Sequence, residues 1–288
     1  MKHIYVIGNG FDIDLGWRTS YRDFYESIYK NWNTCIGLKE NNLPRYVLDH
    51  AGENWFDFER TIYDYCLKKS QEDTPKELME RDRQDYKTFK SQLERFVKDR
   101  SNEPVIEQSK AYEILKSYID KSSHTHLPDD MRPELISFNY TPLSKVAKQI
   151  NPKVNFKYIA IHGTLEKNNC IFGFHDDTNI KGLYRDMQKS MDDNYNPGAI
   201  MPLLMDAGSI TFFGLSMGYI DAVYFSDVLK RISQPGDFNT RKKMDIEFIT
   251  RDKQSKKDIK MNLQDIGIDI QALSTNNKVT FTLTSEKE

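Results

Sequence analysis

The sequence predicts an α/β protein with a mostly parallel sheet and a helical insertion between its first and second strands. Three observations lead to this fold class. A short apolar run, Ile4 to Ile7, stops abruptly at Gly8-Asn9-Gly10. Similar runs return only after residue 134. The stretch between them, about 21–120, is charged and carries its apolar residues at helical spacing.

The predicted strands are short, continuously apolar runs, a pattern typical of strands buried on both faces of a parallel sheet. They cover residues 4–7, 135–138, 158–161, 170–174, 210–213 and 246–249, and an alternating edge strand covers 279–283. Helices are predicted at 142–150, 221–232 and 253–263, the last of them very basic. Strands alternating with helices imply parallel pairing with right-handed crossovers, a Rossmann-like arrangement. Residues 176–205 show no clear period and are interpreted as a lid or a helical excursion.

The insertion is predicted to contain about four helices. Apolar side chains recur at helical spacing around Phe58, Phe89 and Ile114. We therefore expect an α/β nucleotide-binding domain formed by residues 1–20 and 122–288, with a helical insertion at 21–121.

Composition restricts the class of protein. The chain has 288 residues, 38% hydrophobic and 29% charged, with a formal net charge of -2. This balance makes nucleic acid an improbable partner, although a local basic patch at 253–260 stays open. The three cysteines fit a reducing compartment and neither a disulfide framework nor a zinc ribbon. No apolar run is long enough for a membrane span or a signal-peptide core, so we expect a cytoplasmic protein without membrane contact.

The first candidate site is the turn Gly8-Asn9-Gly10-Phe11-Asp12. A glycine turn after a buried first strand lets backbone N–H groups approach a phosphate. The third glycine of a dinucleotide fingerprint is missing, so a plain tight turn is an equally good interpretation of the turn alone. Asp12 would either meet ribose hydroxyls or a catalytic water, or cap the following helix.

Two further polar residues follow predicted strands. Asn139 comes just after the strand at 135–138, where open α/β sheets place their ligands. It would orient a water or a ribose, or else close a turn before Pro142. His162 ends the strand at 158–161 and is a natural general base, although a histidine in this position is more often structural.

A second glycine turn follows the strand at 210–213. In this turn Gly214 lets the backbone approach a ligand, Ser216 can donate to a phosphate or ribose, and Asp221 is either a ligand or the first-turn acid of the next helix. Gly214 to Gly218 also matches the GxSxG nucleophile elbow. A serine hydrolase is disfavoured because no histidine occurs after His175.

Two weaker groups have structural interpretations. His124 and His126 lie in a Pro-rich loop without partners at metal-ligand spacing, and no metal site is predicted. Trp55 to Glu59 is expected to begin a helix that packs its aromatic residues, with Glu59 paired to a basic side chain.

Together these motifs resemble the AbiH-like bacteriophage abortive-infection proteins. The resemblance runs from residue 4 to about 250. Its segments follow one another in order: Gly8 to Asp12, Gly16 to Phe24, Trp55 to Glu59, Phe138 to Thr141, His162-Gly163, Ile171 to Gly173, and Gly214 to Asp221.

That family in turn resembles the sirtuin-type NAD-binding fold. The resemblance implies that Gly8 and Gly10 hold a pyrophosphate, Asn139 orders a water, His162 is the base, and Gly214 and Ser216 line the adenosine side. This chain departs from the sirtuin pattern at Thr141, where an acid is expected, and it has no cysteine zinc module. Protein deacetylation is therefore disfavoured.

The resemblance implies an anti-phage protein that binds NAD or a related nucleotide and hydrolyses the nicotinamide–ribose bond with Asn139, His162 and Asp12. The alternative is a nucleotide-binding sensor or scaffold without turnover. In that case the helical insertion would serve in recognition of a phage-derived trigger or in homo-oligomerisation.

Overall fold

The structure is a computed structural model that describes residues 1–27, 42–50, 58–123, 128, 131–234 and 243–285. The chain divides into two compact units. Unit 1 comprises Met1–Trp17, Pro104–Ile161 and Asn196–Glu288, and unit 2 comprises Arg18–Glu103 and His162–Tyr195.

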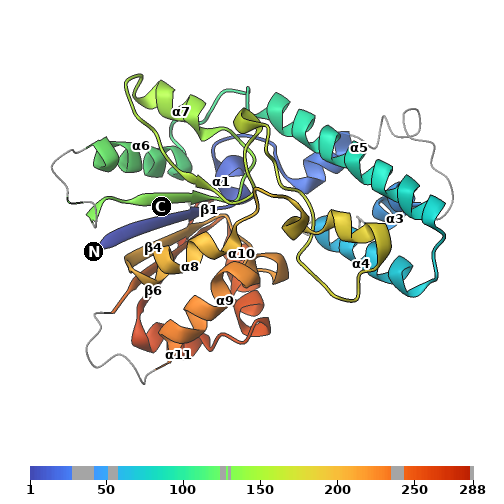
Figure 1. The fold of residues 1–288 in the computed structure, drawn as a ribbon. Coiled ribbons are helices and arrows are strands. Elements are labelled where there is room, and N and C mark those ends of the chain that lie inside the picture. Colours follow the sequence, from blue (N-terminus) through green and yellow to red (C-terminus); the bar gives the residue numbers. More distant parts are fainter. Residues whose placement is uncertain (28–41, 51–57, 124–127, 129–130, 235–242, 286–288) are drawn as a thin grey trace. The chain divides into compact units, whose positions relative to one another are not determined.

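Unit 1 contains a parallel sheet of six strands in the order β3-β2-β1-β4-β5-β6 (Figure 1). The strands are β1 (Lys2–Ile7), β2 (Glu134–Ser137), β3 (Ile159–Ala160), β4 (Ala207–Phe213), β5 (Asp245–Thr250) and β6 (Lys278–Leu283). This is the doubly wound order of dinucleotide-binding folds, in which the direction of strand addition reverses between β1 and β4. The predicted α/β fold with a parallel sheet is confirmed, as is β6 as an edge strand.

Helices cover both faces of this sheet (Figure 1). One face carries α1 (Asn9–Asp14), α6 (Lys110–Ser123) and α7 (Leu143–Ile150), and the other carries α8 (Ile200–Met205), α9 (Tyr219–Ser233), α10 (Lys253–Asp265) and α11 (Ile270–Asn276). Right-handed crossovers produce this distribution, because reversing the direction of strand addition moves the connecting helix to the opposite face.

The core of unit 1 follows the two-residue alternation of its strands. Tyr5 and Ile7 point toward α6 and pack with Leu115 and Ile119. On the opposite face Phe212 stacks on Phe248, with ring centroids 5.2 Å apart, and the stack continues from Phe248 to Phe281 of β6 at 5.1 Å. A sequence rich in Phe and Tyr thus fills the space between sheet and helices with rings.

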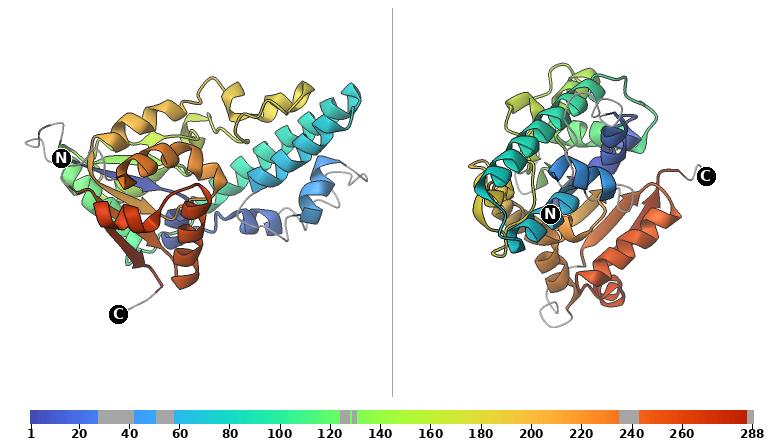
Figure 2. Two further views of the ribbon diagram at one scale, coloured as in Figure 1. Left: turned by 90° about the horizontal axis from the view of Figure 1, so that it is seen from below. Right: turned by 90° about the vertical axis from the view of Figure 1, so that its right-hand side faces the viewer.

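Unit 2 is built around two helices that lie side by side, α4 (Phe58–Gln71) and α5 (Lys76–Arg100) (Figure 2). Unit 2 also contains the smaller α3 (Leu43–His50) and the 3-10 helices η2 (Leu165–Lys167), η3 (Gly182–Met187) and η4 (Lys189–Met191). The 3-10 helix η5 (Pro197–Ala199) belongs to unit 1. The helical periods predicted around Phe58 and Phe89 are confirmed, and these two rings meet edge to face at 5.5 Å.

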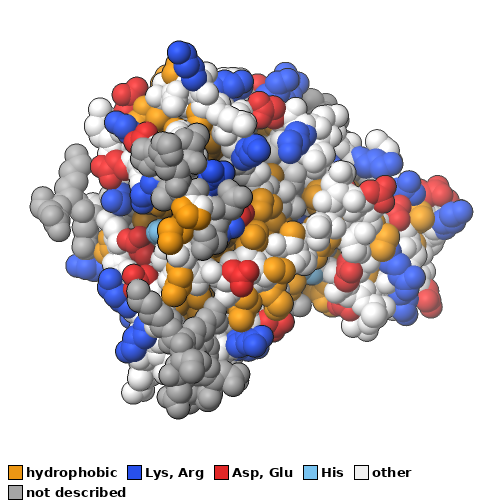
Figure 3. Space-filling model, turned by 60° about the vertical axis from the view of Figure 1, so that its left-hand side comes forward, with side chains coloured by type: hydrophobic (Ala, Val, Ile, Leu, Met, Phe, Trp, Pro, Cys, Tyr) orange, Lys and Arg blue, Asp and Glu red, His pale blue; other side chains and the backbone are white. Residues whose placement is uncertain are grey.

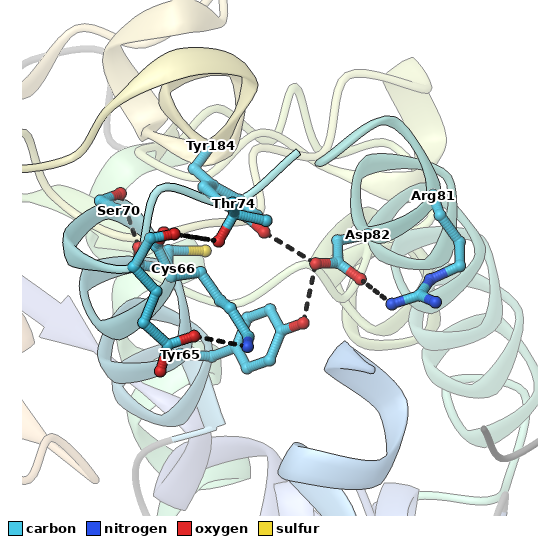
Figure 4. A network of polar contacts seen from close by, with 9 residues as sticks. Tyr65, Cys66, Ser70, Thr74, Arg81, Asp82 and Tyr184 are labelled. Carbon is cyan, nitrogen blue, oxygen red and sulfur yellow. Dashed lines mark hydrogen bonds and ion pairs between the residues drawn. The ribbon is translucent and has the colours of Figure 1, made fainter. Parts of the chain in front are cut away.

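A buried carboxylate joins the elements of unit 2 (Figure 4). Asp82 on α5 is 1% exposed and accepts hydrogen bonds from Tyr65 Oη of α4 at 2.7 Å and from Tyr184 Oη of η3 at 2.8 Å. Arg81 Nη2 also lies 3.3 Å from Asp82 Oδ1. The burial of this charge is therefore compensated by three donors.

The structure departs from the sequence expectations in two places. The predicted strand at 170–174 is wrong. This segment is a buried irregular stretch of unit 2, and an isolated β-bridge pairs its Phe174 with Gln188. The boundaries of the two units also differ from those of the predicted helical insertion at 21–121. Residues 104–121 belong to unit 1, where α6 connects β1 to β2, and residues 162–195 belong to unit 2.

On the face drawn in Figure 3, Lys and Arg side chains are interspersed with Asp and Glu. No helix in the described part of the chain is long and apolar enough to span a bilayer.

Candidate functional site

The glycine turns after β1 and β4 pack directly against each other at the switch point of the sheet. The Gly8 N–H donates to Phe213 O and the Gly10 N–H donates to Gly214 O, both at 2.9 Å. A Cβ atom on Gly10 would lie 2.5 Å from Gly214 Cα, and Gly214 itself has φ of +66°. Glycine is required here because two backbones touch, whether or not a ligand binds.

This packing restricts how the first turn can meet a phosphate. The N–H groups of Gly8, Gly10 and Phe11 all donate to carbonyl groups of the protein. The Phe11 side chain is fully buried, with its ring 5.1 Å from that of Phe213. Because an N–H group makes one strong hydrogen bond, these three amides are not available to a pyrophosphate in this arrangement. The half-buried Asn9 completes the turn.

Asp12 lies in α1, and its side chain is hydrogen-bonded to residues that follow β2. Its carboxylate is 1% exposed and accepts hydrogen bonds from Asn139 Nδ2 at 2.9 Å and Thr141 Oγ1 at 2.8 Å. Asn139 Nδ2 also donates to Gly8 O at 2.9 Å. The N-cap of α1 is Gly8, so the interpretation of Asp12 as a helix cap is wrong.

Burial gives Asp12 unusual acid–base properties. Removal from water raises the pKa of its carboxyl group to about 7, against the opposing hydrogen bonds from Thr141 and Asn139. A carboxyl group with such a pKa can take up or release a proton near neutral pH, as a general acid or base must. From the sequence, Thr141 is notable only as the position where the sirtuin pattern has an acid. No local pattern marks its role, because Thr141 acts through its contact with Asp12, 129 positions away.

The second turn brings Ser216 and Asp221 together. Ser216 is exposed; its Oγ donates to Asp221 Oδ2 at 3.0 Å and accepts from the Gly218 N–H at 3.2 Å. Asp221 lies in the first turn of α9, as one interpretation expected. In this turn the non-glycine residue with positive φ is Met217, at +55°, and not the serine. This geometry differs from that of a nucleophile elbow, whose strained residue is the serine itself.

His162 belongs to unit 2, where it contacts a buried ion pair. Its Nε2 lies 3.3 Å from Nζ of Lys189, which in turn lies 2.9 Å from Glu59 Oε2. The Gly173 N–H donates to the other Glu59 oxygen at 3.3 Å. The expectation that Glu59 pairs with a basic side chain is confirmed. Lys189 was missed because it falls in the stretch 176–205, which has no periodic pattern.

The predicted residues thus fall into separate groups. Unit 1 brings together Asp12, Asn139 and the turn glycines at its switch point, and joins Ser216 to Asp221, whereas His162 is part of unit 2. Among the described residues, no three His, Cys, Asp or Glu side chains are grouped so as to hold a metal ion. The sequence groups at Trp55 to Asp57 and at His124 and His126 lie outside the described residues.

A family model matches most of the chain. The model of the family described as "Bacteriophage abortive infection AbiH" matches residues 4–238, which include both glycine turns, Asp12, Asn139, His162 and Lys189. No curated protein matches the chain.

Proposed function

The chain belongs to the bacteriophage abortive infection AbiH family, and from this premise we propose that it binds NAD at the switch point of unit 1 and hydrolyses the nicotinamide–ribose bond. The observation that carries this proposal is the Asp12 carboxyl group, buried at the carboxyl end of β1 with its pKa raised to about 7. Doubly wound sheets bind their ligands at this position, where the strand order reverses.

Hydrolysis of the nicotinamide–ribose bond can use a carboxyl group that exchanges a proton near neutral pH. In the proposed step a water oxygen forms a bond to C1′ of the ribose, and the bond from C1′ to the nicotinamide nitrogen breaks, with its electron pair leaving on nicotinamide. The water proton passes to the Asp12 carboxylate, and the products are nicotinamide and ADP-ribose. The transition state is oxocarbenium-like, so a nearby negative charge stabilises it. Asn139 would hold the carboxylate and order the water.

The pyrophosphate would be bound by groups outside the first turn, because the amides of Gly8, Gly10 and Phe11 bond within the protein. The exposed Ser216 hydroxyl lies next to the positive end of α9 and would donate to a phosphate or ribose oxygen after turning away from Asp221, which accepts its proton in the structure. The sirtuin resemblance implies a general base at His162, whereas the step proposed here assigns that role to Asp12 of unit 1 and does not involve His162.

The test is release of free nicotinamide from NAD by the purified full-length protein, with and without phage lysate to supply a trigger. Asp12→Asn is expected to reduce turnover by about 10²- to 10⁴-fold, the usual contribution of general acid–base catalysis. Asp206→Asn, at an exposed position of unit 1, is the matched control and should leave turnover unchanged. Absence of turnover from the wild type under both conditions, or equal turnover by Asp12→Asn, would sink the proposal.

The second candidate is a nucleotide sensor or scaffold that acts through partners, with a phage-derived trigger or a further copy of the chain as the class of partner. The observation that favours it is Thr141, which occupies the position where the sirtuin pattern has an acid. Calorimetric titration with NAD distinguishes the two. Binding without nicotinamide release supports the sensor, and binding with release supports the hydrolase.

A further inference from the structure

Three polar side chains form a buried row in unit 2: Glu59, Lys189 and His162. The Lys189 side chain is fully buried, and Glu59 and His162 are 5% and 7% exposed. Lys189 Nζ lies between the other two, 2.9 Å from Glu59 Oε2 and 3.3 Å from His162 Nε2. Glu59 comes from α4 and Lys189 from η4, so the row joins separate elements of the unit.

The hydrogen-bonding capacity of these groups fixes the direction of each bond. An ammonium group has three donors and no acceptor, and the Glu59 carboxylate balances the charge of Lys189 inside the unit. Lys189 therefore donates to His162, and Nε2 must be the acceptor. A neutral imidazole has one acceptor nitrogen and one N–H, so the proton lies on Nδ1. An imidazolium would place an N–H donor against the ammonium donor.

We propose that Lys189 is a positioning residue that holds His162 as the neutral, Nδ1-protonated tautomer, with the Nε2 lone pair bonded to Lys189. His162 can then take up a proton at Nε2 only after the Lys189 bond has opened. For catalysis this means that His162 is not the proton acceptor of the proposed step, which leaves that role to Asp12; this consequence rests on the proposed function, whereas the tautomer does not.

The experiment is a long-range ¹H–¹⁵N correlation spectrum of the ¹⁵N-labelled full-length protein without NAD. The pattern of ring cross-peaks distinguishes the two neutral tautomers and the imidazolium. The His162→Gln variant assigns the His162 signals among the six histidines of the chain. We expect the Nδ1–H pattern in the wild type, and the same pattern in Lys189→Arg, which keeps a donor at this place.

The decisive variant is the double substitution Glu59→Gln with Lys189→Met, which removes both charges together and leaves no unpaired buried ion. In this variant we expect His162 to lose the pure Nδ1–H pattern. Lys181→Met, at an exposed lysine of the same unit, is the control and should keep the wild-type pattern. Circular dichroism verifies that each variant is folded, and the wild-type spectrum decides the tautomer even if the double variant does not fold.

Two results would overturn the inference: an Nε2–H or imidazolium pattern in the wild type, or an unchanged Nδ1–H pattern in the folded double variant. The failure of the proposed function is a different result. A wild type with the Nδ1–H pattern and no nicotinamide release would leave the role of Lys189 standing and remove the hydrolase.

Discussion

At the scale of single residues, the carboxyl group of Asp12 links folding to pH. Burial raises its pKa from 3.8 to about 7. Between these values the folded protein binds more protons at this site than the unfolded chain does. The contribution of Asp12 to the free energy of unfolding is therefore fully present below about pH 4 and is lost as the pH rises through 7.

Asp12→Asn should remove this dependence, because an amide does not titrate. Relative to the wild type, the variant is expected to gain stability between about pH 4 and 7, and the gain should level off above that pH. One pKa unit corresponds to about 1.4 kcal/mol, so the rise to about 7 sets an upper limit of about 4 kcal/mol. Urea unfolding at several pH values measures the difference. A constant difference between the two proteins across this range would contradict the raised pKa.

The contact between the two glycine turns makes a second prediction. Gly10→Ala would place a methyl group 2.5 Å from Gly214 Cα, and backbone atoms cannot move aside as a side chain can. We expect a loss of about 1–3 kcal/mol in the free energy of unfolding, as for other overpacked positions. Gly198→Ala is the control, because the nearest atom to its Cβ would be 3.8 Å away. Equal stabilities of the two variants would show that the turns are not packed in this way.

The sequence identified some residues of the candidate site and missed others for a physical reason. Asp12 and Asn139 could be found because each follows a recognisable buried strand. Thr141 and Lys189 could not, because their roles depend on contacts with residues 129 and 130 positions away in the chain. Such contacts are created by the tertiary fold, and a local pattern does not contain them.

At the scale of elements, Asp82 is expected to determine how firmly α4, α5 and η3 are held together. Asp82→Ala would leave the hydroxyl groups of Tyr65 and Tyr184 without their acceptor. Hydrogen bonds to charged groups contribute about 1.5–3 kcal/mol each, so the loss of two such bonds is expected to lower the unfolding free energy by about 3–6 kcal/mol. Thermal and urea unfolding measure it.

A second aspartate of unit 2 provides the control for this prediction. Asp186 forms an exposed ion pair with Arg83 at 3.2 Å, and pairs of this kind contribute at most about 1 kcal/mol. Asp186→Ala should therefore change stability by much less than Asp82→Ala. Similar losses in both variants would mean that the burial of Asp82 has no special effect.

The elements themselves were predictable to different degrees. Helices α4, α5 and α6 could be predicted because their apolar residues repeat at helical spacing over several turns. The apolar run at 170–174 misled because a buried irregular segment needs the same side chains as a buried strand. A strand differs from such a segment in its backbone pairing with a neighbouring strand, which the apolar pattern does not show. The order of strands in the sheet cannot be predicted from a local pattern either.

At the scale of the whole molecule, the two units share one chain in alternating segments. Unit 2 is formed by residues 18–103 and 162–195, and unit 1 by the segments before, between and after them. A fragment of residues 1–195 contains all of unit 2 but lacks β4, β5 and β6 of unit 1. We expect this fragment to show no cooperative unfolding of the sheet by circular dichroism, since β1 would have lost a neighbour. A sharp transition with the strand content of the full chain would contradict this.

The pairing of β1 with β4 also has a consequence for how the protein is made. These neighbours are separated by about two hundred residues of chain, which a ribosome synthesises in roughly 10–40 s at 5–20 residues per second. Throughout that interval the nascent Ile4 to Ile7 segment has no β4 strand beside it. The turn around Gly214 does not yet exist either. An activity that depends on both turns therefore starts only after β4 and the Gly214 turn have been synthesised, and chains released before that point carry none of it.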